Sequence, residues 1–191
     1  MPDPRRITRE SRYLALLRGV NVGKGPRVPM AEWRALLQAQ GYREVQTLLN
    51  SGNAVFSADG GSAESHAAAI SATLAAQLSL RLQVIVLSAE RLQCVIAGWP
   101  FDLDRIAASQ TLIAMTQHAE DLLALQRIEP LIRPDEQWTI GNEAAYFASP
   151  TGLADSKAAN ALLGLKTVPL TTRNAATLLK LQALLEGAGA H

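Results

Sequence analysis

The feature that most constrains the fold of this chain is an order of predicted strands and helices that occurs twice. In each half, the spacing of apolar residues changes between the period of a strand and that of a helix in the order βαββαβα. The strands are predicted at 13–20, 44–49, 54–57 and 82–87, then at 111–116, 138–140, 145–148 and 167–170. The helices are predicted at 29–40, 64–78 and 89–97, then at 119–128, 155–163 and 174–185.

This order predicts an α+β protein built as a tandem repeat of two ferredoxin-like βαββαβ halves, each with an added C-terminal helix. The split β-α-β order is typical of an antiparallel sheet with helices on one face. We expect the first half at residues 13–100 and the second at 101–191. Residues 1–12 contain four arginines without apolar periodicity, so they are expected to form a flexible N-terminal arm.

The second face of each predicted sheet also has to be covered. Val84 and Val86 point away from the side to which Ile85 and Leu87 point, and all four side chains are apolar. The cover could come from the closing helices, from the other half or from a second copy of the chain.

The composition is that of a folded protein and argues against extensive nucleic-acid binding. Hydrophobic residues make up 48% of the chain and charged residues 18%, whereas disordered chains have few apolar residues. The net charge of +1 is small for a surface that displaces counterions from nucleic acid. Aromatic residues make up only 5%, too few for a sheet that stacks RNA bases. A basic patch formed by residues 5–12 with Arg18 and Lys24 remains the one surface that could bind nucleic acid.

The cysteine and histidine residues predict neither a disulfide nor a metal site. Cys94 is the only cysteine, which suits a reducing cytoplasm, and its apolar neighbours predict a buried thiol that reacts slowly. His66, His118 and His191 lack the spacing of metal ligands, and nothing indicates a cofactor. No apolar run reaches the about 18 residues of a membrane span, so we expect a cytoplasmic protein.

The glycine-rich loop at residues 18–25 (RGVNVGKG) is the strongest candidate for chemistry. It joins a predicted strand to a predicted helix, where exposed backbone N–H groups favour an anion, and Arg18 and Lys24 would add positive charge. It lacks the third glycine of a dinucleotide fingerprint and the Gly-Lys-Ser/Thr of a Walker loop. The alternative is that the glycines only permit a tight turn.

Two other segments suggest polar contacts, each with a structural alternative. Residues 50–53 (NSGN) offer amides and a hydroxyl, but they are also typical of a hairpin turn. In residues 171–174 (TTRN), a threonine can cap the following helix. The positive charge of Arg173 is unfavourable beside the positive end of the helix dipole, so an anion or an acidic partner is favoured near it. Lys157 follows Ser156 in a helix, where neighbouring residues do not face each other, so a Ser/Lys nucleophile pair is disfavoured.

Taken together, these motifs resemble a bacterial family known as domain of unknown function 1697. The resemblance rests on residues 16–23 (LLRGVNVG), 28–30 (VPM), 51–53 (SGN) with Val55 and Phe56, and 172–174 (TRN). It implies an α/β fold of two ferredoxin-like halves and no established activity, substrate or cofactor. The chain departs from the family pattern where Lys24 precedes Gly25 and where Ala175 stands in place of a tryptophan.

The sequence therefore predicts a pocket for a small ligand that carries a phosphate or a carboxylate. Its expected residues lie at the ends of elements, where ligands usually bind: Arg18, Asn21, Gly23, Lys24, Asn53, Lys157, Arg173 and Asn174. Arg18 and Arg173 are expected to share one concave surface. The alternative is a noncatalytic regulatory module that forms a homodimer through the second sheet face. No acid/base pair is evident, so the sequence names no reaction and no catalytic residue.

Overall fold

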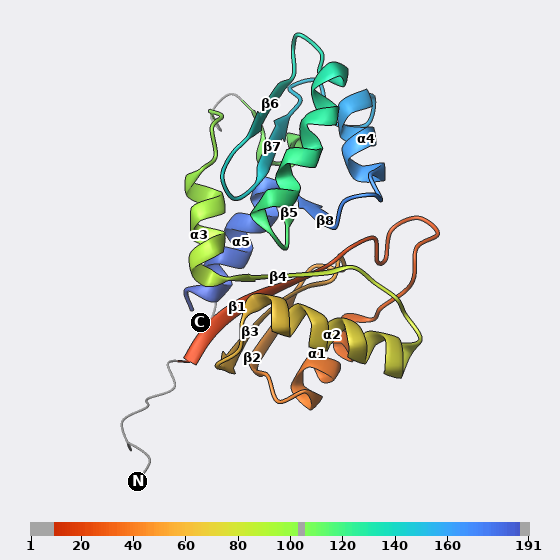
Figure 1. Cartoon of the computed structure of the whole chain (residues 1–191), viewed down its shortest axis with the longest axis vertical. Coiled ribbons are helices and arrows are strands. Elements are labelled where there is room, and N and C mark those ends of the chain that lie inside the picture. The colour runs from red at the N-terminus through yellow and green to blue at the C-terminus, as the bar shows by residue number, and fades with distance from the viewer. Residues whose placement is uncertain (1–9, 103–105, 188–191) are drawn as a thin grey trace.

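The protein is an α+β structure with two four-stranded antiparallel sheets. The computed structural model describes residues 10–102 and 106–187. The first sheet has the order β2-β3-β1-β4 and contains β1 (Glu10–Leu17), β2 (Arg43–Leu48), β3 (Asn53–Asp59) and β4 (Val84–Ser88). The second has the order β6-β7-β5-β8 and contains β5 (Thr111–Thr116), β6 (Gln137–Ile140), β7 (Ala145–Ala148) and β8 (Leu170–Arg173). Figure 1 shows the first half below the second.

Most helices begin at a side-chain cap that the sequence supplies. The helices are α1 (Met30–Ala39), α2 (Ala63–Leu78), α3 (Ala89–Ala97), η1 (Ala108–Gln110), η2 (Ala119–Leu131), α4 (Lys157–Gly164) and α5 (Ala175–Leu185). Ser62, Ser88, Ser156 and Asn174 accept a hydrogen bond from the backbone N–H three residues later, which satisfies a donor in the first turn. No described helix is long and apolar enough to cross a membrane.

Three predicted elements differ clearly from the structure. The strand predicted at 13–20 is β1 at Glu10–Leu17, three residues earlier. The helix predicted at 119–128 is a 3-10 helix that extends to Leu131 and includes Pro130 near its end. The strand predicted at 167–170 lies at Leu170–Arg173 instead. Its threonines are β-branched and pair with β5, while Asn174 provides the helix cap that the prediction gave to a threonine.

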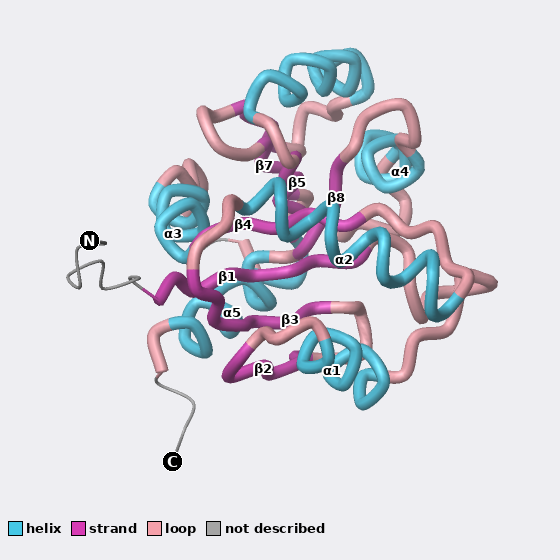
Figure 2. Tube along the Cα trace, turned by 60° about the horizontal axis from the view of Figure 1, so that its bottom comes forward, coloured by secondary structure: helices cyan, strands magenta, loops and turns pink. Residues whose placement is uncertain are grey.

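The hydrophobic core lies in three layers. In the first half, α1 and α2 bury side chains such as Trp33 and Ile70 against one face of the first sheet. In the second half, η2 and α4 cover the outer face of the second sheet. Between them lies a shared core, in which Leu14 and Ile85 of the first sheet meet Ile113 of the second sheet together with α3 and α5. Figure 2 shows β4, β1, β3 and β2 in succession across the first sheet.

The second face of the first sheet is therefore covered within the chain. Leu14, Leu16, Ile85 and Leu87 are at most 1% exposed. They are covered by the closing helices α3 and α5 and by the second half. The closing helices and the other half were two of the three sources of cover considered from the sequence. In Figure 1, α3 and α5 lie side by side at the junction of the halves.

The N-terminal arm predicted for residues 1–12 overlaps the first strand. Residues 10–12 belong to β1, and Arg12 pairs with Ser57 of β3. The Arg12 guanidinium donates hydrogen bonds to the carbonyls of Leu184 and Leu185 at the end of α5, where a cation is favourable. Arg12 is thus part of the fold, and residues 1–9 lie outside the described residues.

The predicted burial of Cys94 is wrong, because its side chain is exposed. Helix α3 buries Leu92 and Val95 against the shared core. With 3.6 residues per turn, position 94 faces away from these two residues. The apolar neighbours of Cys94 in the sequence indicated a buried helix but not which side of it faces solvent.

His66 lies in a buried aromatic cluster whose hydrogen-bond partners select one tautomer of its neutral ring. Its Nε2 is 3.1 Å from the carbonyl oxygen of Gly60, and its Nδ1 is 3.0 Å from the hydroxyl of Tyr42. The rings of Tyr13 and Phe56 pack around it. Since Gly60 can only accept, Nε2 carries the proton and Nδ1 accepts from Tyr42. Burial lowers the pKa of His66 from its usual 6.5.

We expect acidification to destabilise the protein through His66. As the pH falls below 6.5, the unfolded chain takes up the proton more readily than the folded protein, so the free energy of unfolding decreases. His66→Gln should remove this part of the pH dependence, measured by urea denaturation between about pH 7.5 and pH 5. The exposed His118→Gln variant serves as the control. An unchanged pH dependence in His66→Gln would contradict this assignment.

Candidate functional site

A cleft lies between the two halves where β1, β8, the β2–β3 hairpin and the end of α4 meet. Its volume is about 380 Å³. The residues that line it come from both halves and are Leu17, Arg18, Gly19, Val20, Val22, Ser51, Leu163, Thr171, Thr172 and Arg173. The cleft thus contains apolar side chains, hydroxyl groups and two arginines. As expected from the sequence, Arg18 and Arg173 line one concave surface.

Arg173 uses all five N–H groups of its guanidinium, and three of them join the two halves. Within the second half, Nη1 donates to Thr171 Oγ1 at 2.8 Å and to the Thr172 carbonyl at 2.7 Å. Toward the first half, Nε donates to Asn53 Oδ1 at 2.5 Å. Nη2 donates to the carbonyls of Leu17 at 2.7 Å and Ser51 at 3.0 Å. Arg173 therefore contributes its positive charge to the cleft but no free hydrogen-bond donor.

The charge of Arg173 persists although burial disfavours it. Burial lowers the pKa of Arg173 to about 10, so the group is protonated at neutral pH. All five of its acceptors are neutral oxygens, three of them backbone carbonyls. These oxygens solvate the cation without neutralising it.

Arg18 reaches across the cleft to the end of α4. Its Nη2 donates to the carbonyl of Leu163 at 3.1 Å and to that of Leu165. The C-terminus of a helix favours a cation. Burial lowers the pKa of Arg18. No described residue accepts a hydrogen bond from its Nε. Arg18 is thus the arginine that retains a donor for a further partner.

Neither arginine has an acidic partner among the described residues. No carboxylate of residues 10–102 or 106–187 lies within ion-pair distance of Arg18 or Arg173. Burial is the sole cause of the lowered pKa in both cases. The cleft therefore holds two positive charges that the described part of the chain leaves uncompensated.

Two of the predicted amides hold the local structure. Asn21 has a positive φ of 58°, and its Nδ2 donates to the carbonyls of Val28 at 2.8 Å and Asn50 at 2.7 Å. Asn53 is buried and donates to the Leu48 carbonyl at 3.0 Å while it accepts from Arg173. Both amides are therefore engaged within the protein, as the turn interpretation expected.

Six of the eight predicted residues are absent from the cleft lining, namely Asn21, Asn53 and the four that follow. Gly23 and Lys24 are exposed in the loop after β1, and Lys157 is exposed at the start of α4. Asn174 caps α5 by accepting from the N–H of Thr177 at 2.8 Å. The lining residues that sequence reasoning missed are Leu17, Gly19, Val20, Val22, Ser51, Leu163, Thr171 and Thr172. All but Leu163 lie within segments already singled out, whereas nothing local distinguished Leu163.

The sequence matches the model of a protein family over residues 11–146, described as a protein of unknown function, DUF1697. This chain belongs to the DUF1697 family. A comparison with curated proteins gave no match. Among solved structures, the DUF1697 chain is similar to the conserved bacterial protein SP0830 from Streptococcus pneumoniae, with 24% identity and a TM-score of 0.78. The likeness covers 92% of this chain and 99% of that one, and it shows a shared fold.

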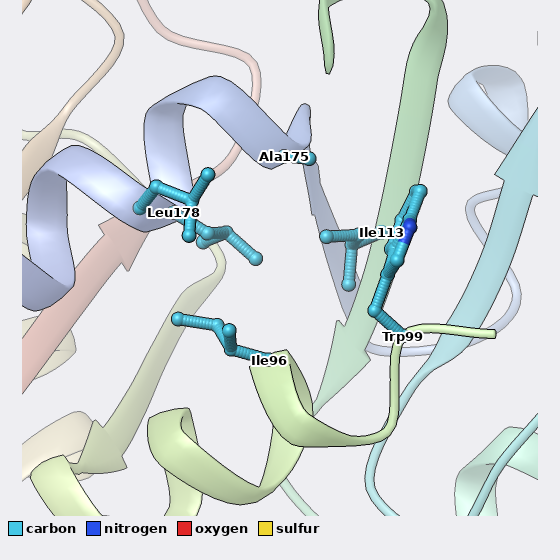
Figure 3. Close-up of a pocket in the computed structure, with 6 residues that line it drawn as sticks. Ile96, Trp99, Ile113, Ala175 and Leu178 are labelled. Atoms are coloured by element: carbon cyan, nitrogen blue, oxygen red, sulfur yellow. The ribbon is translucent and has the colours of Figure 1, made fainter. Parts of the chain in front are cut away.

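A second cavity in this DUF1697 protein is apolar. Its volume is about 230 Å³, and it lies between α3, α5 and β5 (Figure 3). It is lined by Ile96, Trp99, Ile113, Ala175, Leu178 and Leu179. None of these side chains carries a charge, so the cavity offers no group for anion binding or proton transfer. Among the described residues, no group of three acidic, histidine or cysteine side chains could hold a metal ion.

Proposed function

We propose that the cleft between the halves binds a small anionic ligand, one that carries a carboxylate or a phosphate. The observation that carries this proposal is that Arg18 and Arg173, 155 positions apart, line one cleft without a carboxylate partner among the described residues. Each charge sits in a partly buried space without a counterion, and an anion in the cleft would supply one. Among the described residues that line the cleft, no acid/base pair supports a particular reaction, so the proposal is one of binding.

The two arginines have different roles in this proposal. Arg173 supplies charge and holds the hairpin, β1 and β8 together, because its donors are already used. Arg18 supplies a charge-assisted hydrogen bond to the ligand through its remaining donor. Arg18 is therefore the residue with which to test binding.

We expect Arg18→Gln to abolish stabilisation by anions. A ligand at 100 times its Kd raises the free energy of unfolding by about 2.7 kcal/mol in the wild-type protein. The measurement is the shift in Tm caused by inorganic phosphate or by short carboxylates, at constant ionic strength. Arg34→Gln, which removes an exposed arginine from α1, is the matched control. Equal shifts in the Arg18→Gln variant and the wild type would refute the assignment of the site.

The two other functions considered from the sequence have less support. A homodimer built on the second sheet face would need a surface that α3 and α5 already cover. Nucleic-acid binding would need a free basic strip, but the Arg12 guanidinium is engaged with carbonyls at the end of α5, and Arg18 lies in the cleft between the halves.

We also propose that each half is a ferredoxin-like repeat of a bacterial, cytoplasmic protein. The first half runs β-α-β-β-α-β with the strand order β2-β3-β1-β4, and the second has the corresponding order β6-β7-β5-β8. In the second half, η2 stands in the place of the first helix. The resemblance to a bacterial protein supports a bacterial source. The lone cysteine supports a reducing cytoplasm as the compartment.

A further inference from the structure

We infer that the ligand of the inter-half cleft is a carboxylate with a hydrocarbon body of several carbon atoms. This inference rests on the proposed function and adds the chemical class of the ligand. Three properties of the cleft support it: its size, the apolar side chains of its lining, and the small number of arginine N–H groups that remain free.

The cleft is larger than an inorganic anion requires. Its volume of about 380 Å³ corresponds to roughly a dozen water molecules at about 30 Å³ each. A phosphate or sulfate ion would fill only part of it. The remaining space accommodates an organic body attached to the charged group.

Apolar side chains from both halves line that space. Leu17 and Val20 are already buried, at 0% and 1% exposure, so the apolar surface that a ligand could cover comes from two other residues. Val22 from the loop after β1 is 57% exposed, and Leu163 near the end of α4 is 47% exposed. Single exposed hydrophobic residues are common, but these two line the same cleft from opposite halves. A hydrocarbon chain in the cleft would remove both side chains from water.

The charged donors of the cleft, which are the arginine N–H groups, favour a carboxylate over a phosphate. All five N–H groups of Arg173 are used, and both Nη2 protons of Arg18 go to carbonyls of the α4 end. A phosphate group carries three acceptor oxygens and up to two negative charges, which need several donors. A carboxylate has one charge and can be held by Arg18 alone, within the field of Arg173.

Titration calorimetry with straight-chain carboxylates from acetate to octanoate tests this inference. Each added methylene group should lower the Kd by about fourfold until the cleft is filled. The alcohol of each chain length should bind more weakly than the acid of the same length. Inorganic phosphate should bind more weakly than the longer acids. Arg18→Gln should reduce the affinity for each acid to that of its alcohol.

Variants of the apolar lining separate this cleft from other binding sites. Leu163→Ser and Val22→Ser should each flatten the dependence on chain length and weaken octanoate binding by about tenfold. Leu123→Ser, at a residue of η2 that is 64% exposed, is the control and should bind like the wild type.

The outcomes distinguish a failure of this inference from a failure of the proposed function. If neither phosphate nor any carboxylate binds, the proposed function fails. If phosphate or acetate binds as tightly as octanoate and Arg18→Gln abolishes binding, the anion site stands and the hydrocarbon body is refuted. If octanoate and octanol bind equally, or if Leu163→Ser retains the full chain-length dependence, the chain binds elsewhere and the inference is overturned.

Discussion

Replacing Arg173 with alanine is expected to lower the free energy of unfolding by about 4 kcal/mol, because the change leaves buried acceptors on both halves without a donor. The lost hydrogen bonds include those to Asn53 and to the carbonyls of Leu17 and Ser51, which join the second half to the first. The measurement is urea denaturation of the unliganded protein. This expectation follows the structural alternative for Arg173, since an exposed arginine would cost less than about 1 kcal/mol.

Two further variants define the cause of the loss. Arg173→Lys keeps the charge but has three donors in place of a planar group of five, so we expect it to recover only part of the stability. Arg34→Ala removes an exposed arginine and should change the free energy of unfolding by less than about 0.5 kcal/mol. A loss below about 1 kcal/mol in Arg173→Ala would show that its five contacts contribute little.

Replacing Gly52 with alanine is expected to lower the free energy of unfolding by about 3 kcal/mol, through backbone strain and a steric clash. Gly52 lies in the β2–β3 hairpin with a φ of +74°. A Cβ there would lie 2.6 Å from Cβ of Leu17 and 2.8 Å from Cγ2 of Val20. Both neighbours are buried and line the cleft, so neither can move away without distorting it.

Gly41→Ala is the matched control for this substitution. Gly41 has a similar positive φ of +88°, but an added Cβ would meet no atom within 4 Å. It should therefore show only the backbone cost of about 1 kcal/mol. Equal losses at the two positions, measured by chemical denaturation, would show that the close approach of the hairpin to β1 does not matter for stability.

These expectations decide which variants can test ligand binding. Arg173 and Gly52 hold the walls of the cleft in place, so their variants would change binding and stability together. Arg18, Val22 and Leu163 are partly or largely exposed, and their substitution leaves the contacts of Arg173 intact. They are the appropriate positions at which to separate recognition from folding.

Local sequence patterns predicted most elements of the fold. The helix at 89–97 and the strands at 111–116 and 145–148 have the predicted bounds, because their apolar periodicity is regular and turn or cap residues flank them. The errors arose where local signals compete. Threonines suit both a strand and a helix cap, and assigning them to the cap placed the predicted strand before β8. The apolar residues of η2 follow a helix-like spacing, so the sequence did not reveal that this helix is a 3-10 helix.

The sequence by itself determined most elements, their repeated order and every segment of the cleft lining except that of Leu163, since these depend on residues close together in the chain. Only the tertiary structure decided which residues converge. It brought Arg173 against Asn53 and the end of β1, left Lys24 and Lys157 exposed outside the cleft lining, and covered the second face of the first sheet with α3 and α5. These results depend on contacts between residues more than a hundred positions apart, and local spacing carries no information about such contacts.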